Sequence, residues 1–255
     1  MNNIMDYPLL VFLFSFFVLW LSFRIGGPFL QKIWVLKQSV REDFTNIVAP
    51  TRALLALLIG FSFAMAVNRY DLRKINEAAE ANAIGTEYRR ADLLPAADAA
   101  KVRALLRDYL DQRVLAYLTR NASQVQQINA RTATLQNELW AAVATPAQTK
   151  QIPNIGLVIG GMNNVLESQG TTQAGWWNRI PPPAWALLMA LAIGSSLLIG
   201  YSAQNLKEEG YLNLILPLVL AISFLLIADI DSPHGGLIRT YPHNLERLVE
   251  TLRSV

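Results

Sequence analysis

Four long apolar stretches constrain the fold of this chain more than any other feature of its sequence. They span residues 8–23, 52–68, 184–201 and 211–230, and charged residues are nearly absent from them. Crossing the hydrocarbon core of a bilayer takes about 20 residues of α-helix. Because backbone groups in lipid must be paired within the protein, we predict an all-α membrane protein with four transmembrane helices.

Charged residues return between the second and third stretches, where an all-α domain is predicted to be inserted outside the bilayer. Residues 69–94 are expected to continue the second helix as far as Pro95. Apolar residues three and four positions apart predict further helices over 96–118, 121–144 and 154–168, with Pro146 and Pro153 bracketing a linker. The predicted parts are therefore two transmembrane helices with their connector (1–68), the inserted domain (69–180), a transmembrane hairpin (181–230) and a C-terminal tail (231–255).

The boundaries of the membrane helices carry further expectations. Residues 1–7 lack Lys and Arg, and no small-residue cleavage site follows the first stretch, so we interpret it as a retained helix. Residues 29–51 are expected to form an amphipathic connector, with Pro50 marking the entry to the second span. Residues 202–210 are expected to form the turn of the hairpin, and the tail is expected to end in an amphipathic helix. Tryptophans flank the prolines at 181–183 and are expected at the membrane–water interface: Trp176, Trp177 and Trp185.

Basic residues near the short loops predict the orientation. Six lie in the first connector and the hairpin turn, against three in the tail and none before the first span. The positive-inside rule then places both termini and the inserted domain away from the cytoplasm, although Arg69, Arg73 and Lys74 beside the second span favour the opposite orientation.

Composition excludes several classes of function. The chain has no cysteine, two histidines, a net charge of +3 and no long basic cluster, which excludes thiol chemistry and argues against nucleic-acid binding. No nucleophile–base pair, phosphate-binding loop or zinc signature is present, so we expect neither an enzyme nor a cofactor. Asp229, Asp231 and His234 are possible metal ligands by residue type, but their spacing matches no specific metal motif.

Small residues recur every four positions along the second span, at Ala56, Gly60 and Ala64, and Asn68 follows at the same interval. The third span has two such stripes, one at positions 186, 190 and 194 and one at 192, 196 and 200. Small residues let helix backbones approach closely in lipid, so tight packing within or between chains is one interpretation. The other is that a stripe lines a narrow pore, with Gly60, Ala64 and Asn68 in its wall.

The two places where helices leave the membrane hold the remaining candidates. Asp229 and Asp231 end the fourth span, where a carboxylate is costly unless it is paired or hydrated. They are either a functional site or interfacial groups that cap the turn and pair with Arg52, Arg69 or Arg239. Beside the second span, Arg69 and Arg73 are either interfacial anchors or a ring at a pore mouth that attracts anions; Asp71 is a further ion-pair or gating candidate.

Several segments resemble the bestrophin-like family of bacterial membrane proteins. They are the second span with its extension (57–95), above all Ala81–Thr86, the Pro-Pro-Pro before the third span, the Gly200-Tyr201 that ends it, and the D-x-D-x-P-x-x-G-L-I-R pattern from Asp229 to Arg239. The resemblance implies four transmembrane helices with an inserted helical domain in a bacterial inner membrane. It also implies a homo-oligomeric channel, since bestrophins are pentameric chloride channels.

Two hypotheses for function follow. The first is a homo-oligomeric channel for inorganic ions, with anions favoured, whose second helix lines the axis. The alternative is a non-conducting membrane scaffold or sensor whose helical domain binds a partner or a signal. A closed ring with a continuous central path distinguishes the channel from the scaffold.

Overall fold

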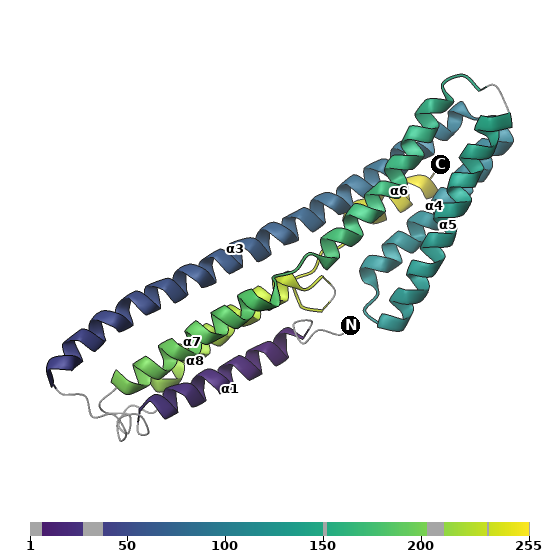
Figure 1. Cartoon of the computed structure of the whole chain (residues 1–255). Helices are drawn as coiled ribbons and strands as arrows, with labels where there is room; N and C mark the ends of the chain where they lie inside the picture. The colour runs from purple at the N-terminus through teal and green to yellow at the C-terminus, as the bar shows by residue number, and fades with distance from the viewer. Residues whose placement is uncertain (1–6, 28–37, 150–151, 203–211, 234, 255) are drawn as a thin grey trace. The chain divides into compact units, whose positions relative to one another are not determined.

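In a computed structural model, the described residues (7–27, 38–149, 152–202, 212–233 and 235–254) form helices and no strands. The helices are α1 (Pro8–Gly26), α3 (Gln38–Arg90), the 3-10 helix η2 (Ala91–Leu93), α4 (Ala96–Leu118), α5 (Ala122–Thr149), α6 (Ile155–Trp177), α7 (Pro182–Ser202), α8 (Leu212–Asp231) and α9 (His243–Arg253) (Figure 1). The chain divides into two compact units, Met1–Arg69 with Arg179–Arg239, and Tyr70–Asn178 with Thr240–Val255.

In the first unit, α1 packs along both α7 and α8 (Figure 1). α7 and α8 meet through Trp185 and Phe224, whose rings lie edge to face at 6.2 Å. Several hydroxyl groups within the apolar helices are satisfied locally. Ser22 donates to the Val18 carbonyl oxygen at 2.7 Å, and Ser223 donates to the Val219 carbonyl oxygen at 2.9 Å. Such bonds keep polar groups paired where water is absent.

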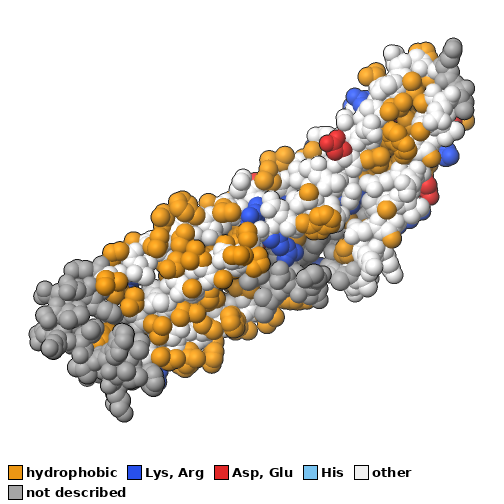
Figure 2. Space-filling model, viewed as in Figure 1, with side chains coloured by type: hydrophobic (Ala, Val, Ile, Leu, Met, Phe, Trp, Pro, Cys, Tyr) orange, Lys and Arg blue, Asp and Glu red, His pale blue; other side chains and the backbone are white. Residues whose placement is uncertain are grey.

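The first unit exposes more large apolar side chains than is usual for a protein surface in water. Large side chains exposed on it include Leu9, Leu13, Phe14, Phe17, Leu57, Phe61, Ile215 and Val219, and hydrophobic side chains dominate the face of this unit in Figure 2. Four helical stretches are long and apolar enough to cross a membrane: Pro8–Gly26, Ile47–Leu93, Ile155–Tyr201 and Leu214–Asp231. Within the second and third of these, the apolar parts are 52–68 and 184–201, because the charged residues other than Arg52 lie outside them.

The second unit has its own core, built from α4, α5, α6, α9 and the end of α3. Fully buried members include Ile84, Val102, Leu106, Leu135, Leu139, Val158, Met162 and Leu245. α4 packs along α5 and also contacts α9, and α5 packs against α6. The three- and four-residue spacing of these apolar positions is that of helices with one buried face.

Two prolines predicted to bound segments lie inside helices instead. α3 begins at Gln38 and continues through Pro50, and α5 continues through Pro146 to Thr149. A proline removes one backbone hydrogen bond from a helix. Next to the backbone hydrogen bond that Pro50 cannot donate, the Thr51 hydroxyl donates to the Ile47 carbonyl oxygen at 2.8 Å. Pro146 lies in the last turn, where little helix remains to be disrupted. Residues 29–37 of the expected connector and residues 203–210 of the expected hairpin turn (202–210) lie outside the described residues.

α6 is longer than the apolar pattern predicted, reaching Trp177 instead of Ser168. Gly170 costs about 1 kcal/mol relative to alanine inside a helix. Buried Thr172 and Trp176 offset that cost. Trp176 was expected at the membrane interface, but it lies in the core of the second unit with its ring 5.1 Å from that of Tyr117. Trp177 is 74% exposed.

Candidate functional site

The apolar part of α3 presents its small residues on the side away from the helices of its own chain. Leu55 and Ala66 are buried, whereas Gly60, Ala64 and Asn68 are exposed and a Cβ added at Gly60 would meet nothing within 4 Å. Ala66 and Gly60 are six residues apart, which is about 240° around the helix axis. The small-residue stripe is therefore available to lipid, to solvent or to another copy of the chain.

The third span uses one of its two small-residue stripes for packing within the chain. Ala192 and Ser196 are 0% exposed, and Gly200 is buried. On the other stripe, Ala186 and Ala190 are exposed, and a Cβ at Gly194 would meet nothing within 4 Å. Within the described residues, only the stripe at positions 192, 196 and 200 is thus used to bring helices together.

The end of α8 holds the Asp229 carboxylate in a turn of the chain. Its Oδ1 accepts the N–H of Leu237 and its Oδ2 accepts the N–H of Ile238, each at 2.8 Å. Gly236 makes this turn possible, because a Cβ there would overlap Asp229 Oδ1 and lie 2.6 Å from Asp229 Cγ. Two backbone donors thus stabilise the buried carboxylate. The segment 235–238 thus folds back over the end of the fourth span.

Asp231 joins three parts of the first unit. Its Oδ1 lies 3.2 Å from Nη1 of Arg69, and its Oδ2 accepts the N–H of Ile180 at 3.0 Å. Ile180 precedes Pro181, Pro182 and Pro183, which have no N–H to donate. The aspartate therefore satisfies the last backbone donor before α7 begins and brings negative charge close to the start of that helix.

The other sequence candidates are more dispersed. Arg52 and Asp71 are exposed, and Arg239 is half-buried. Arg73 belongs to the second unit and is only 2% exposed. Of the three arginines considered as partners of the two aspartates, Arg69 is the one that forms an ion pair with Asp231. Among the described residues no group of three His, Asp or Glu side chains is placed to hold a metal ion, and His234 lies outside them.

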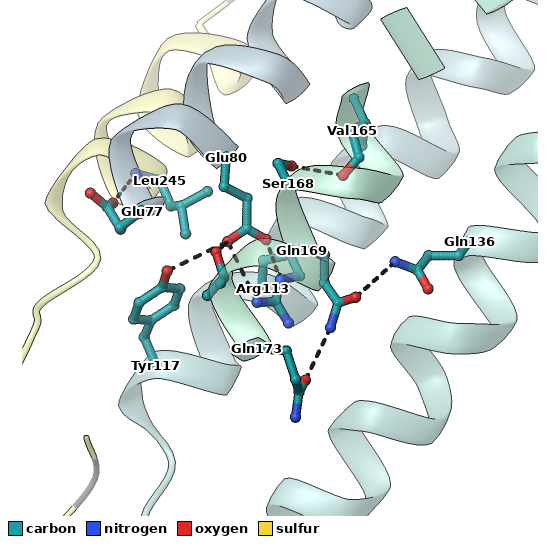
Figure 3. Close-up of polar contacts among 11 residues, drawn as sticks. Glu77, Glu80, Arg113, Tyr117, Gln136, Val165, Ser168, Gln169, Gln173 and Leu245 are labelled. Atoms are coloured by element: carbon teal, nitrogen blue, oxygen red, sulfur yellow. Dashed lines mark hydrogen bonds and ion pairs between the residues drawn. The ribbon is translucent and has the colours of Figure 1, made fainter. Parts of the chain in front are cut away.

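A buried ion pair that the sequence analysis missed lies at the centre of the second unit. Glu80 of α3 and Arg113 of α4 are both 0% exposed, and Arg113 Nε donates to Glu80 Oε1 (Figure 3). Thr172 of α6 donates to Glu80 Oε2 at 3.1 Å. The Arg113 guanidinium also lies over the ring of Trp176, 5.8 Å from its centroid. One carboxylate therefore connects three helices. The available signal was that Arg113 falls on the apolar stripe of α4, between Tyr109 and Tyr117.

The charges of this pair are held in place by each other. Burial disfavours the charged form of Arg113, but the adjacent Glu80 carboxylate outweighs it and raises the pKa of the guanidinium. Burial and the same carboxylate raise the pKa of the Tyr117 hydroxyl, which stays protonated. The two opposite charges cancel, and hydrogen-bond donors surround the carboxylate. The cluster is therefore suited to fixing the positions of the helices that it connects.

Glu77, one turn before Glu80, holds the C-terminal helix. Its Oε1 accepts the N–H groups of Asn244 and Leu245, each at 2.9 Å, and its Oε2 accepts Asn244 Nδ2 at 2.6 Å. The first N–H groups of a helix lack intrahelical partners, and a carboxylate there also interacts favourably with the helix dipole. Glu77 therefore caps α9 from α3, across 167 residues of sequence.

Together, the apolar first unit and the polar second unit define an all-helical membrane protein with four candidate spans. The family model for the bestrophin-like domain matches residues 9–245, so the chain belongs to the bestrophin-like family. No curated protein matches the chain.

Solved structures of low sequence identity have the same fold. A crystal structure of a bacterial bestrophin homologue from Klebsiella pneumoniae matches with a TM-score of 0.64 and 12% identity, over 95% of this chain and 94% of that one. A second structure of the homologue, phased with zinc, matches with a TM-score of 0.63 and 13% identity, over 94% and 95%. A structure described as a membrane protein matches with a TM-score of 0.65 and 12% identity, over 95% and 97%. The chain therefore has the bestrophin fold.

Proposed function

We propose that this protein is a homo-oligomeric ion channel in which α3 of each copy lines the central path. The observation that carries the proposal is the exposed stripe of Gly60, Ala64 and Asn68 on α3. Small side chains leave room for a path along the axis, and Asn68 adds a polar group at one end of the apolar stretch. Membership of the bestrophin-like family supports the same conclusion.

We propose anions as the conducted ions, on the basis of the resemblance to bestrophins and of the basic residues at the span ends. Arg52 lies at one end of the apolar stretch and Arg69 at the other. The Arg69 charge is partly neutralised by Asp231. Arg73 is buried, so we leave it out of the proposed lining. The helical unit of residues 70–178 is proposed to lie outside the bilayer, on the non-cytoplasmic side of a bacterial inner membrane.

The test is ion flux through the purified protein in liposomes, with assembly followed by native mass spectrometry. Gly60→Leu should reduce flux because its side chain enters the path. Gly194→Leu is the matched control, since a Cβ at either glycine would meet nothing within 4 Å. A monomeric protein, or equal flux in the two variants, would contradict the proposal. A closed ring with no flux in any variant would favour the scaffold or sensor.

Selectivity is tested at the ion pair. Asp231→Asn removes the negative charge beside Arg69 and should shift the reversal potential toward that of chloride. Arg69→Ala removes the positive charge and should shift the reversal potential away from that of chloride. Asp229→Asn, which leaves that pair in place, is the comparison. Reversal potentials that are the same in all four proteins would remove Arg69 from the conduction path.

A further inference from the structure

Glu87 of α3 is a carboxylic acid buried without a partner. Its side chain is 0% exposed, and within the described part of the chain neither carboxyl oxygen has a hydrogen-bond partner. Buried polar groups in native proteins nearly always have one. An ionised carboxylate without a partner is especially costly in an apolar site. Packing alone does not account for a glutamate at this position.

Gly161 of α6 provides the space that the Glu87 carboxyl occupies. A Cβ at Gly161 would overlap Glu87 Oε2 and lie 2.5 Å from Arg90 Nη1 and 3.0 Å from Glu87 Cδ, whereas a Cβ at the neighbouring Gly160 would meet nothing within 4 Å. One turn further along α3, Arg90 Nη1 donates to the Leu157 carbonyl oxygen at 3.2 Å. Glu87 therefore lies where α3 and α6 pack against each other, in a recess that exists because residue 161 is glycine.

Few charges face this recess from α3 and α6. α6 has no ionisable residue between 155 and 166, and its Glu167 is exposed. On the same face of α3, the neighbouring charges are Arg90, one turn after Glu87, and Glu80, two turns before it. Glu80 is already paired with Arg113 of α4. Arg90 is thus the nearest cation, and its guanidinium is bonded to the α6 backbone.

The remaining charges near this end of α3 are engaged elsewhere. Arg103 and Arg107 of α4 lie over the Tyr88 ring, and Asp92 of η2 pairs with Arg103. α9, with its own charged residues, packs on Gly85. Gly85 is two residues from Glu87, about 200° around the helix axis. Neither α4, η2 nor α9 therefore supplies a counter-charge to Glu87.

This setting changes the acidity of the side chain. Burial raises the pKa of Glu87 from 4.5 to about 8, and the Arg90 charge lowers it only in part. Between pH 4.5 and about 8, Glu87 is therefore protonated in the folded protein and ionised in the unfolded chain. Its free energy of unfolding should fall as the pH rises through that interval and level off above it.

We propose that Glu87 is a proton-binding site that controls how tightly α3 packs on α6. When it is neutral, the carboxyl fits the recess at Gly161. When it is ionised, it needs water or a cation. The nearest cation, Arg90, already donates to the Leu157 carbonyl oxygen, so an ionised Glu87 would compete with that hydrogen bond for the guanidinium and loosen the contact between the helices.

The consequence for ion flux rests on the proposed channel function. α3 contributes residues to both units, and its apolar part is the proposed lining of the path. A proton bound at Glu87 would then alter the helix that lines the path, and flux would change as the pH passes through about 8. Binding of the proton itself is independent of conduction and is tested separately.

The first test is infrared difference spectroscopy of the full chain in detergent, titrated across neutral and alkaline pH. A band from a protonated carboxyl should be present at pH 7 and disappear as the pH passes through about 8. Glu87→Gln should abolish this band, and Glu167→Gln, at an exposed glutamate of α6, should leave it unchanged. A band that persists in Glu87→Gln, or one absent from the wild type, would overturn the proposal.

Two glycine variants test the recess without removing the acid. Gly161→Ala should displace the Glu87 carboxyl together with the Arg90 guanidinium beside it and move the titration of Glu87 toward lower pH, whereas Gly160→Ala should titrate as the wild type does. The same titration in both variants would show that the recess does not set the protonation of Glu87.

Liposome flux separates this site from the proposed channel. Flux that changes with pH in the wild type but not in Glu87→Gln supports the coupling, and identical pH dependence in the two proteins contradicts it. If no protein conducts while the infrared band behaves as described, the channel proposal fails and the proton site stands.

Discussion

Gly26 of α1 and Gly200 of α7 lie against each other where these two helices cross. A Cβ at Gly200 would overlap the Phe23 carbonyl oxygen and lie 3.3 Å from the Cα of Gly26. A Cβ at Gly26 would overlap the Leu197 carbonyl oxygen and lie 2.9 Å from the carbon of that carbonyl. Each glycine thus lets the backbone of its helix touch the backbone of the other, as small residues do in membrane helix pairs.

Gly200→Ala should destabilise the first unit. Alanine ordinarily favours a helix by about 1 kcal/mol over glycine. Here the added methyl would meet rigid backbone, and overpacking of this kind costs about 1–3 kcal/mol. Thermal unfolding in detergent should show a lower midpoint for Gly200→Ala. Gly194→Ala, on the open stripe of the same helix, should equal or exceed the wild type. A Gly200→Ala variant as stable as Gly194→Ala would mean that α1 and α7 do not cross this closely.

The amino-acid pattern of the third span predicts two small-residue stripes but not which one is used. Both have the same spacing and consist of small residues, so helical periodicity cannot distinguish them. The choice depends on Gly26, which lies on a different helix and 174 positions away from Gly200. Spans and helix boundaries follow from local composition, whereas the pairing of faces depends on a partner that is distant in the sequence.

Asp229→Asn should loosen the turn at 235–238. The asparagine NH₂ would face the N–H of Leu237 or of Ile238, so one donor would lose its acceptor. Leaving a fully buried donor unpaired costs about 1–3 kcal/mol. Because Leu237 and Ile238 are exposed residues, we expect a cost at or below the lower end of that range. Hydrogen exchange should show faster exchange of the Leu237 and Ile238 amides in this variant. Asp71→Asn, at an exposed aspartate, should leave both amides as in the wild type. Unchanged exchange in Asp229→Asn would rule out the two hydrogen bonds as the restraint on this turn.

Glu80→Gln should strongly destabilise the second unit, because it leaves the Arg113 charge buried without its counter-ion. Breaking a buried pair from one side costs about 3–5 kcal/mol. The matched control is Glu138→Gln. Its partner Arg131 lies at 3.8 Å and both side chains are more than 40% exposed, so the expected cost is about 0–1 kcal/mol. Equal thermal midpoints for Glu80→Gln and Glu138→Gln would mean that the Glu80–Arg113 pair does not stabilise the fold.

The polar interior of the second unit was the part that the sequence did not disclose. Glu77, Glu80 and Glu87 recur at helical spacing along α3, but charged residues on a helix are ordinarily solvated, and the pattern alone does not identify a buried face. Their partners are distant: Arg113 is 33 residues from Glu80, Thr172 is 92 residues from it, and Asn244 is 167 residues from Glu77. Apolar periodicity predicted α4 and α9 as helices. It could not indicate that α9 is capped by a carboxylate of α3.

Glu77→Ala should release the C-terminal helix while the rest of the second unit stays folded. The variant removes the acceptor for the N–H groups of Asn244 and Leu245, and losing a helix cap costs about 0.5–2 kcal/mol. α9 still buries Leu245 and Leu252, so we expect it to open more often without detaching completely. Limited proteolysis should cleave between 240 and 255 faster in Glu77→Ala than in the wild type. Glu250→Ala, at an exposed position of α9, should be cleaved at the wild-type rate. If both variants were cleaved at that rate, burial of Leu245 and Leu252 would hold α9 without help from Glu77.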